Sequence, residues 1–199
     1  MKTKKFTIVG ATGCLIAAFH GIASPASAAD LEDPPGWTQS EFVAAAAAEG
    51  VPVDVAAQAW LDPDRLKQIP VGSSLESSGQ GSDESASATG YSAWCAYTKT
   101  NVLGQTLARL TVSSDWSAEG SGIVTVDTNI ETEVGWGWAF QGLPYSKDAY
   151  STAFENPQGA HTAIRWANYS WGPDGDASTL KVSIVSLALG SHTCSSQEN

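Results

Sequence analysis

The sequence predicts a mainly β fold: an antiparallel β-sandwich or small barrel of about six or seven strands, preceded by a short helical segment and a flexible linker. Within residues 122–140, the even positions from 124 on hold Val, Ile, Thr, Trp or Phe, and the odd positions from 125 on hold polar or small residues. This period of two is typical of strands with one buried face. Similar short segments recur between residues 91 and 194, with turn residues between them and no helical periodicity.

The alternating stretch itself is too long for one strand of a small domain. Fully extended, it would span roughly 55 Å. We therefore expect a break near Asp127–Glu131 and two strands. The parity also predicts that Trp136 and Trp138 face the core, and the alternation of a later strand predicts the same for Trp166.

Residues 1–28 have the features of a secretory signal peptide. Three lysines among the first five residues precede an apolar run, and Ala26-Ser27-Ala28 offers a cleavage site before Ala29. Glycines and a histidine interrupt the run, which argues against a membrane anchor. Cys14 raises a lipoprotein alternative, which the apolar residues after it disfavour. We expect a secreted, extracellular protein without an anchor.

The charge of the chain is strongly acidic. Its formal net charge of -11 falls to -14 after cleavage, because the signal peptide contains three lysines and no acids. Nucleic-acid recognition needs a basic surface, and binding to anionic membranes needs a polybasic patch. The sequence therefore predicts neither nucleic acid nor a membrane surface as a partner.

Cleavage leaves two cysteines, Cys95 and Cys194. In an oxidising compartment their default state is a disulfide. It would close a loop of about 100 residues and contribute about 3–5 kcal/mol. A zinc site is the weaker alternative, because two thiols without nearby histidines do not complete one.

Residues 29–71 form the predicted helical segment. Thr38 and Glu41 have the spacing of a capping box, and Gly50 can end the alanine-rich helix that follows. Two more short helices follow before Pro70. Helices this short form no core of their own, so they must dock on the β-domain or on another protein.

Residues 72–90 are rich in Gly, Ser and acids, and predict a flexible linker between this segment and a β-domain of residues 91–199. Such a tether would let the segment act independently. Its large apolar side chains would then anchor a partner by helix-in-groove docking, and the expected anchors are Trp37, Phe42, Val55, Trp60 and Leu66. A solvated loop that joins two docked parts is the alternative.

Candidate catalytic residues are few. The chain has no nucleophile elbow, zinc-protease motif or phosphate-binding loop. His161 with Asp174 or Asp176 and a serine could be imagined as a triad, but a surface position for His161 is the better interpretation. Glu131 and Glu133 share one strand face, as paired glycosidase carboxylates can, but a solvated face explains them better. No catalytic residue is expected.

The run Asp174-Gly-Asp176-Ala-Ser178 places oxygens at alternate positions, as calcium loops do. It lacks the glycine placement and the terminal glutamate of an EF-hand, so an ordinary turn is the preferred interpretation. We expect no metal site and no cofactor.

Aromatic side chains are the most suggestive feature of the β-domain. Exposed aromatics on a β face can stack on sugars or anchor a protein partner. Tyr169 and Trp171 fall off the predicted inward parity of their strand, so they are the expected surface aromatics.

Several short motifs follow one another along the mature chain: Trp60-Leu-Asp-Pro-Asp64, Ile69-Pro-Val71, the Ser/Gly stretch, Tyr91-Ser-Ala-Trp-Cys95, Ser114-Asp-Trp116 and Trp136-Gly-Trp138. Together they resemble uncharacterised small secreted proteins of actinobacteria, a likeness that implies the layout and no active site. The layout is also similar to that of the adaptor subunits of Streptomyces umbrella toxin particles. That resemblance implies an N-terminal segment docked in a larger toxin subunit and a globular part that holds a lectin.

The function expected from the sequence is therefore that of a secreted, non-enzymatic interaction or adaptor protein. It would dock a larger secreted partner through its N-terminal segment, as a component of an extracellular antibacterial toxin complex. The alternatives are a carbohydrate-binding β-sandwich module, which would have a glycan partner, and a protease inhibitor or hydrolase.

Overall fold

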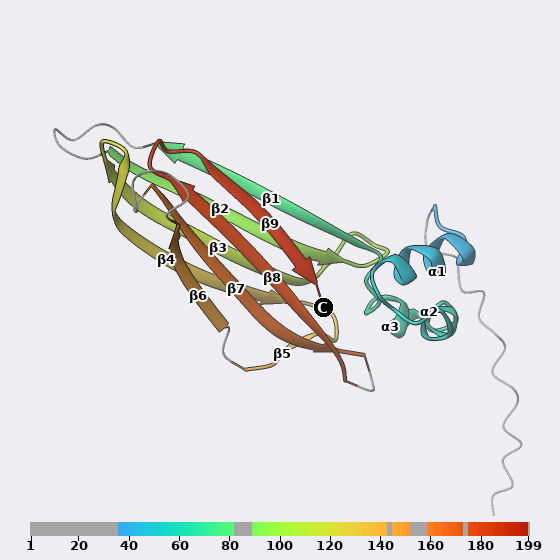
Figure 1. Ribbon diagram of the computed structural model, residues 1–199. Helices are drawn as coiled ribbons and strands as arrows, with labels where there is room; N and C mark the ends of the chain where they lie inside the picture. The colour runs from blue at the N-terminus through green and yellow to red at the C-terminus, as the bar shows by residue number, and fades with distance from the viewer. Residues whose placement is uncertain (1–35, 82–88, 143–144, 152–158, 173–174, 199) are drawn as a thin grey trace, which may run out of the picture. The chain divides into compact units, whose positions relative to one another are not determined.

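A computed structural model describes residues 36–81, 89–142, 145–151, 159–172 and 175–198 of the protein (Figure 1). All of them belong to one compact unit, Glu32–Asn199. The predicted signal peptide lies outside the described residues.

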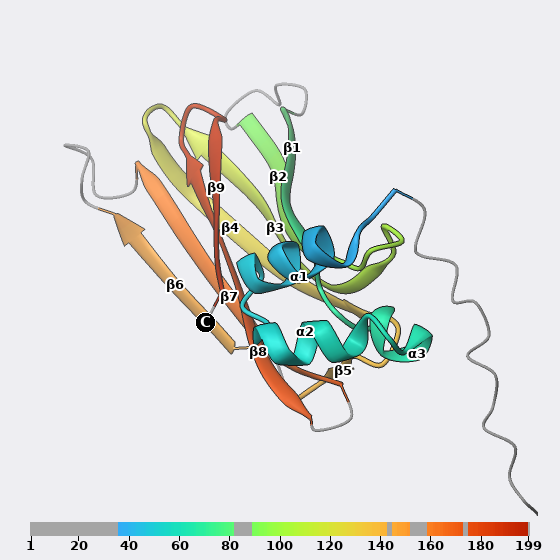
Figure 2. The ribbon, with the colours of Figure 1, turned by 90° about the vertical axis from the view of Figure 1, so that its right-hand side faces the viewer.

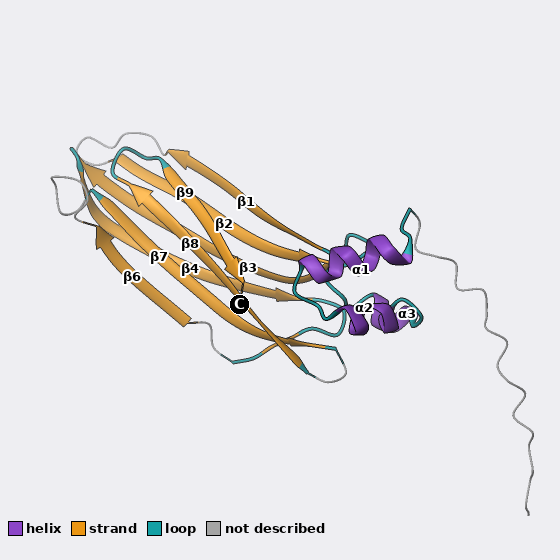
Figure 3. Ribbon diagram, turned by 45° about the vertical axis from the view of Figure 1, so that its right-hand side comes forward, coloured by secondary structure: helices purple, strands orange, loops and turns teal. Residues whose placement is uncertain are grey.

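Two antiparallel sheets pack face to face as a sandwich (Figure 3). The first has the order β1-β2-β3-β4, with strands β1 (Gly72–Gly81), β2 (Thr89–Thr100), β3 (Thr106–Glu119) and β4 (Gly122–Val134). The second has the order β5-β7-β8-β9, with β6 paired to β7; its strands are β5 (Ala139–Phe140), β6 (Tyr145–Ser151), β7 (Ala160–Trp171), β8 (Asp176–Leu187) and β9 (His192–Glu198). The predicted fold class is confirmed, although the described residues hold nine strands instead of six or seven.

Strand β1 occupies much of the predicted linker. It pairs residue by residue with β2, from Gly72 opposite Thr100 to Gly81 opposite Tyr91. Its side chains are exposed from Ser73 onward, so they show no alternation between a buried and a wet face. Backbone hydrogen bonds hold this strand in place. The linker prediction is therefore wrong for residues 72–81, and residues 82–88 lie outside the described part of the chain.

The alternating stretch forms two strands, as predicted, but the break near Asp127–Glu131 is wrong: β4 is continuous from Gly122 to Val134, and the second strand is the short β5. The chain turns instead at Gly135, whose N–H donates to Leu107 O at 2.9 Å. A Cβ on Gly135 would lie 2.3 Å from Thr106 O, so the turn needs glycine. The turn also separates the two tryptophans: Trp138 is buried as predicted, whereas Trp136 is 52% exposed.

The alternation of β7 runs opposite to the prediction. Its inner face holds Arg165, Tyr169 and Trp171, which are buried, while Trp166 lies on the outer face. The Tyr169 hydroxyl donates to Arg109 O at 3.1 Å, across the sandwich, and burial raises the pKa of Tyr169. Tyr169 and Trp171 are therefore core residues, not surface aromatics: the Tyr169 hydroxyl has a partner between the sheets, and both rings pack against Trp138.

The disulfide between Cys95 and Cys194 is present, with a Cα–Cα distance of 5.8 Å. It joins β2 of the first sheet to β9 of the second. Around it, the inner faces of the central strands supply a closely packed apolar core, whose largest aliphatic side chains are Leu107, Leu110, Val112, Leu180, Val182 and Ile184. The sequence prediction of this bond is confirmed.

Three short helices lie at one end of the sandwich (Figure 2): α1 (Gln39–Ala48), α2 (Val53–Ala59) and α3 (Pro63–Leu66). The capping box of Thr38 and Glu41 is formed as predicted. Direct bonds hold the segment to the sheets, since the Trp138 indole N–H donates to Gln68 O at 2.9 Å. The segment therefore packs against its own β-domain.

The core of the sandwich continues into these helices. Phe42 has no exposed surface, and its ring lies 5.4 Å from that of Trp60. Of the five expected partner anchors, Phe42 and Leu66 are buried, and Trp37, Val55 and Trp60 are half-buried. The exposed apolar side chains of the segment are instead Val53 and Leu61, at 60% and 69%.

A buried ion cluster joins the helices to both sheets. The ammonium group of Lys99 on β2 is fully buried and binds Glu49, the C-cap residue of α1, and Glu198 of β9. Ser73 Oγ donates to Glu49 at 3.2 Å, and Ser178 Oγ donates to Glu198 at 3.0 Å. Burial by itself lowers the pKa of Lys99, but the bonds to Glu198 and Glu49 outweigh it and raise the pKa.

We predict that Phe42→Ala lowers the free energy of unfolding by about 3–4 kcal/mol, because it leaves a cavity between α1 and the end of the sandwich. Leu61→Ala, at an exposed position of the same segment, should change it by less than about 0.5 kcal/mol. Urea unfolding of both variants measures the difference. Equal stabilities would mean that the segment does not share the core of the sandwich.

Lys99→Met should cost about 2–4 kcal/mol, since it leaves two carboxylates close together without their cation. Lys147→Met is the matched control, because this lysine is exposed and forms no ion pair with an acid that the structure describes. The pKa of Lys99 is higher in the folded state than the usual value of about 10.4, so the unfolded chain loses this proton first and the stability that Lys99 contributes declines as the pH rises above that value.

Tyr169 contributes a slope of the same sign, because its pKa is also raised. The difference between wild type and Lys99→Met, measured by urea unfolding from pH 8 upward, isolates the lysine. A difference that does not change with pH would contradict the ion cluster.

Candidate ligand-binding surface

The outer face of the second sheet brings together an aromatic pair and two lysines. Trp166 of β7 lies opposite Tyr145 on β6 and opposite Lys181 on β8. Lys147 occupies the next outward position of β6, opposite Ile164. We call Tyr145, Lys147, Trp166 and Lys181 the platform.

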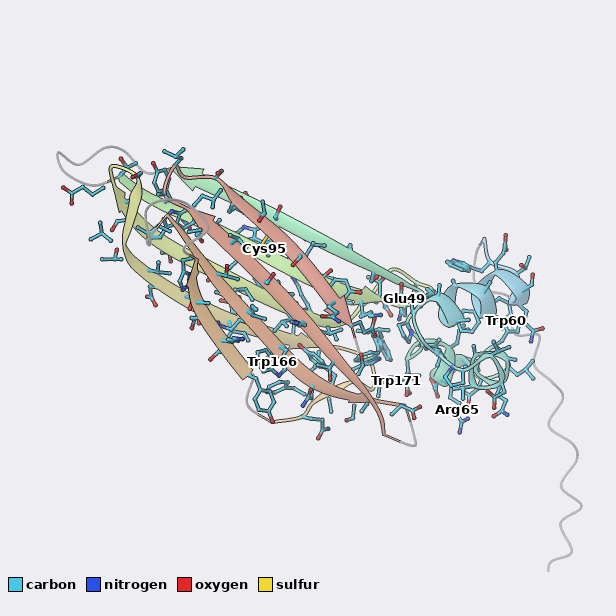
Figure 4. The ribbon with its side chains drawn as sticks, in the orientation of Figure 1. Glu49, Trp60, Arg65, Cys95, Trp166 and Trp171 are labelled. Carbon is cyan, nitrogen blue, oxygen red and sulfur yellow. A yellow bond between two sulfur atoms is a disulfide. The ribbon has the colours of Figure 1, made fainter. Side chains whose placement is uncertain are left out.

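The two aromatic rings of the platform stack on one another. Their centroids lie 5.7 Å apart, and their planes make an angle of 14°. Tyr145 is 52% exposed and Trp166 is half-buried. Figure 4 shows the side chain of Trp166 on its strand, far from Trp171 at the end of the sandwich near the helices. The pair is therefore an apolar group on the outer face of the sheet that stays partly exposed to the solvent.

A hollow of about 420 Å³ adjoins Trp166. It is lined by Lys147, Ile164, Trp166, Asn168, Thr179 and Lys181. Thr179 Oγ1 donates to Asn168 Oδ1 at 2.9 Å, which orients the Asn168 amide beside the ring. The hollow therefore combines the Trp166 ring with the Asn168 amide, the Thr179 hydroxyl and the ammonium groups of two lysines.

The lysines of the platform differ from the other described bases. The structure describes seven Lys and Arg residues, and five of them form ion pairs: Arg65, Lys67, Lys99, Arg109 and Arg165. Lys147 and Lys181 form none with a described acid; Lys181 Nζ donates to Gln197 Oε1 at 3.2 Å. Both unpaired bases thus lie on the same face.

The outer face of the first sheet has the opposite charge. A hollow of about 500 Å³ lies beside Trp94 and Arg109, and its lining includes Glu131 and Glu133. Both glutamates are exposed on one face, as the sequence predicts for a solvated row. Arg109 is already bound to Glu76 at 3.3 Å. An anionic ligand would meet net negative charge there.

A third hollow, of about 390 Å³, lies between the helices and the sheets. Trp138 and Trp171 stack in its wall with ring centroids 5.8 Å apart. Its carboxylates, Glu49 and Glu198, are the partners of Lys99. The polar groups of this hollow already bind one another, and they hold the helices in place.

His161 is buried between the sheets, so the predicted surface position is wrong. Its Nε2 lies 3.8 Å from Asp148 Oδ1, which also accepts from the Arg165 guanidinium at 2.9 Å. The pKa of His161 is lowered, because burial outweighs the nearby Asp148 carboxylate and Arg165 adds to the effect. Neutral His161 is part of the packing between β6 and β7.

The imagined triad does not assemble with Asp176, the one of its two candidate acids that the structure describes. His161 lies opposite Ser186, whereas Asp176 lies opposite Trp171, about 33 Å away along β8. Asp174 is outside the described residues. Ser186 shares a hydrogen bond with Ser114 at 3.0 Å, and both are fully buried, so a substrate would not reach them.

Sequence reasoning missed the whole platform. Lys181 alternates with the buried Leu180 and Val182, which marks the odd positions of β8 as outward. Because Trp166 is the register partner of Lys181, this alternation could have predicted that Trp166 faces the solvent. The predicted surface aromatics of this strand were on the wrong parity.

Comparison with known proteins finds no counterpart. No family model matches the chain, and no curated protein or solved structure is significantly similar to it. Among the described residues, no helix is long and apolar enough to cross a membrane, and no three His, Cys, Asp or Glu side chains are grouped to hold a metal ion. The function must be inferred from the surfaces themselves.

Proposed function

We propose that this protein is a secreted, non-enzymatic binding protein that recognises carbohydrate through the platform. The observation that carries the proposal is the exposed, stacked pair of Tyr145 and Trp166 on the outer face of a sandwich. An aromatic face is electron-rich, so it attracts the weakly positive C–H groups on the flat side of a sugar ring. The adjoining hollow supplies the hydrogen-bonding groups that sugar hydroxyls need.

Secretion is supported by two features. The first 28 residues have the pattern of a signal peptide. The Cys95–Cys194 bond suits an oxidising compartment. An extracellular protein of this kind would meet polysaccharides of cell surfaces or of the surrounding medium.

We predict that Trp166→Ala weakens glycan binding about 10- to 30-fold, as expected for the loss of a central aromatic anchor. Trp94→Ala is the matched control, since Trp94 is a half-buried tryptophan on the outer face of the other sheet. A glycan array identifies the ligand, and calorimetry with wild type and both variants measures its affinity.

Three results would count against the proposal: no glycan bound by the wild type, full affinity in Trp166→Ala, or loss of affinity only in Trp94→Ala. The melting temperatures of both variants must stay within a few degrees of wild type. Tyr145→Ala, which removes the more exposed ring, provides a second test if Trp166→Ala fails to fold.

A second candidate function, an adaptor that docks a larger secreted protein, is favoured by the exposed apolar side chains of the helical end. Val53 and Leu61 are largely exposed, as is Trp136, whose ring lies 5.2 Å from Lys67 Nζ. In this proposal the helical segment stays packed on its own sandwich and contacts the partner with its outward side. A stable complex in culture supernatant that is lost in Leu61→Asp and kept in Trp166→Ala would favour the adaptor.

A further inference from the structure

We infer that the ligand of the platform is an acidic polysaccharide, a chain of sugars that carry carboxylate or sulfate groups. This inference rests on the proposed carbohydrate function and extends it to the class of sugar. It depends on where the chain places its unpaired positive charge. The full sequence has 21 acids and 10 bases, so an accessible, unpaired base is scarce.

Both unpaired bases of the described chain flank the same aromatic ring. Lys181 on β8 lies directly opposite Trp166 on β7. Lys147 lies on β6, on the other side of β7, two residues along from Tyr145, the partner of Trp166. From strand spacings of about 4.8 Å and a rise of about 3.4 Å per residue, the two Cα atoms are about 12 Å apart. A sugar stacked on Trp166 would therefore have an ammonium group on each side.

The acids that follow Lys147 and Gln197 in the sequence have side chains on the inner side of the sheet, away from the platform. Asp148 follows Lys147 but has the opposite parity, and its carboxylate binds Arg165. Glu198 follows Gln197 on β9 and binds Lys99 on the inner side. The outward positions of β6, β7, β8 and β9 that the structure describes hold no Asp or Glu. The platform is thus a local positive surface on an acidic protein.

The range of electrostatic forces makes this local charge decisive. At physiological salt the screening length is about 8 Å, so acids on the opposite sheet are largely screened from a ligand on the platform. An exposed ion pair strengthens binding by a factor of up to about 5, and two such pairs by up to about 25-fold. The lysines would therefore select among sugars, while the aromatic pair supplies binding that is common to all.

The test uses two forms of one sugar chain, polygalacturonate oligosaccharides and their fully methyl-esterified form, in which each carboxylate is an uncharged ester. We expect wild type to bind the acid form about 10-fold more tightly than the ester. That preference should shrink between about 50 mM and about 500 mM salt, where screening shortens the reach of the lysines. Heparin oligosaccharides form a second arm, and stronger binding to them would assign sulfate as the preferred group.

Lys147→Gln/Lys181→Gln should remove the preference for the acid form and keep weak binding to the ester, whereas Trp166→Ala should lose both. Lys67→Gln, which changes a base at the helical end, is the matched control and should behave as wild type. Melting curves establish that each variant is folded.

Equal binding of acid and ester, or a double variant that keeps the preference, would overturn the acidic-ligand inference and leave the carbohydrate function intact. Wild type that binds none of these sugars, nor any on the glycan array, would overturn the proposed function as well. Equally tight binding of a poly-glutamate peptide would overturn the inference in favour of an acidic protein partner.

Discussion

Each strand of a two-sheet sandwich must give one face to the core, and this constraint decides which side chains can meet a ligand. In β7 the inner face takes Arg165, Tyr169 and Trp171. Arg165 binds Asp148, Tyr169 donates to Arg109 O, and the Trp171 ring stacks on Trp138. Trp166 is left on the outer face, beside Tyr145. The platform is thus a consequence of how the interior of the sandwich is filled.

The described bases of the chain have two kinds of position: some join secondary-structure elements through ion pairs, and others lie at the surface without one. Lys99 is buried with Glu49 and Glu198, and so joins α1, β2 and β9 at one end of the sandwich. A buried charge is tolerated only with such partners. Lys147 and Lys181 have no such role in the described structure, and their cost of desolvation is small because they lie at the surface. Their charge is available for binding.

Local sequence signals predicted several features correctly. The capping box of Thr38 and Glu41 depends on residues three apart, and the bond between Cys95 and Cys194 depends on there being two cysteines after cleavage. The alternation of β4 is confirmed only in its middle, at positions 126–130; Val124 and Val134 are exposed and Ile123 is buried instead. The fold class followed from the repeated alternation of strands. These signals depend little on what packs against each element.

The misplaced features depend on tertiary contacts. Strand β1 has a Gly/Ser composition that is typical of linkers, and only its pairing with β2 makes it a strand. In β7 the hydrophobic Ile164 and Trp166 predict the wrong inner face. The true inner face holds Arg165, and a buried arginine is tolerated only because Asp148 of another strand pairs with it, which the sequence of β7 does not show. The sequence predicts an independent helical segment because residues 72–90 resemble a linker. The ion partners of Lys99, which join the segment to the sheets, lie far apart in the sequence and so give no local signal.

The most direct test of the central claim, that the outer face of the second sheet binds sugar, is an NMR titration of the indole N–H groups with polygalacturonate oligosaccharides. The tryptophans report on separate places: Trp166 on the platform, Trp94 on the opposite sheet and Trp136 at the turn near the helices. We predict a saturating shift of the Trp166 signal, with Trp94 and Trp136 unchanged. A shift of Trp94 or Trp136 without Trp166 would contradict it.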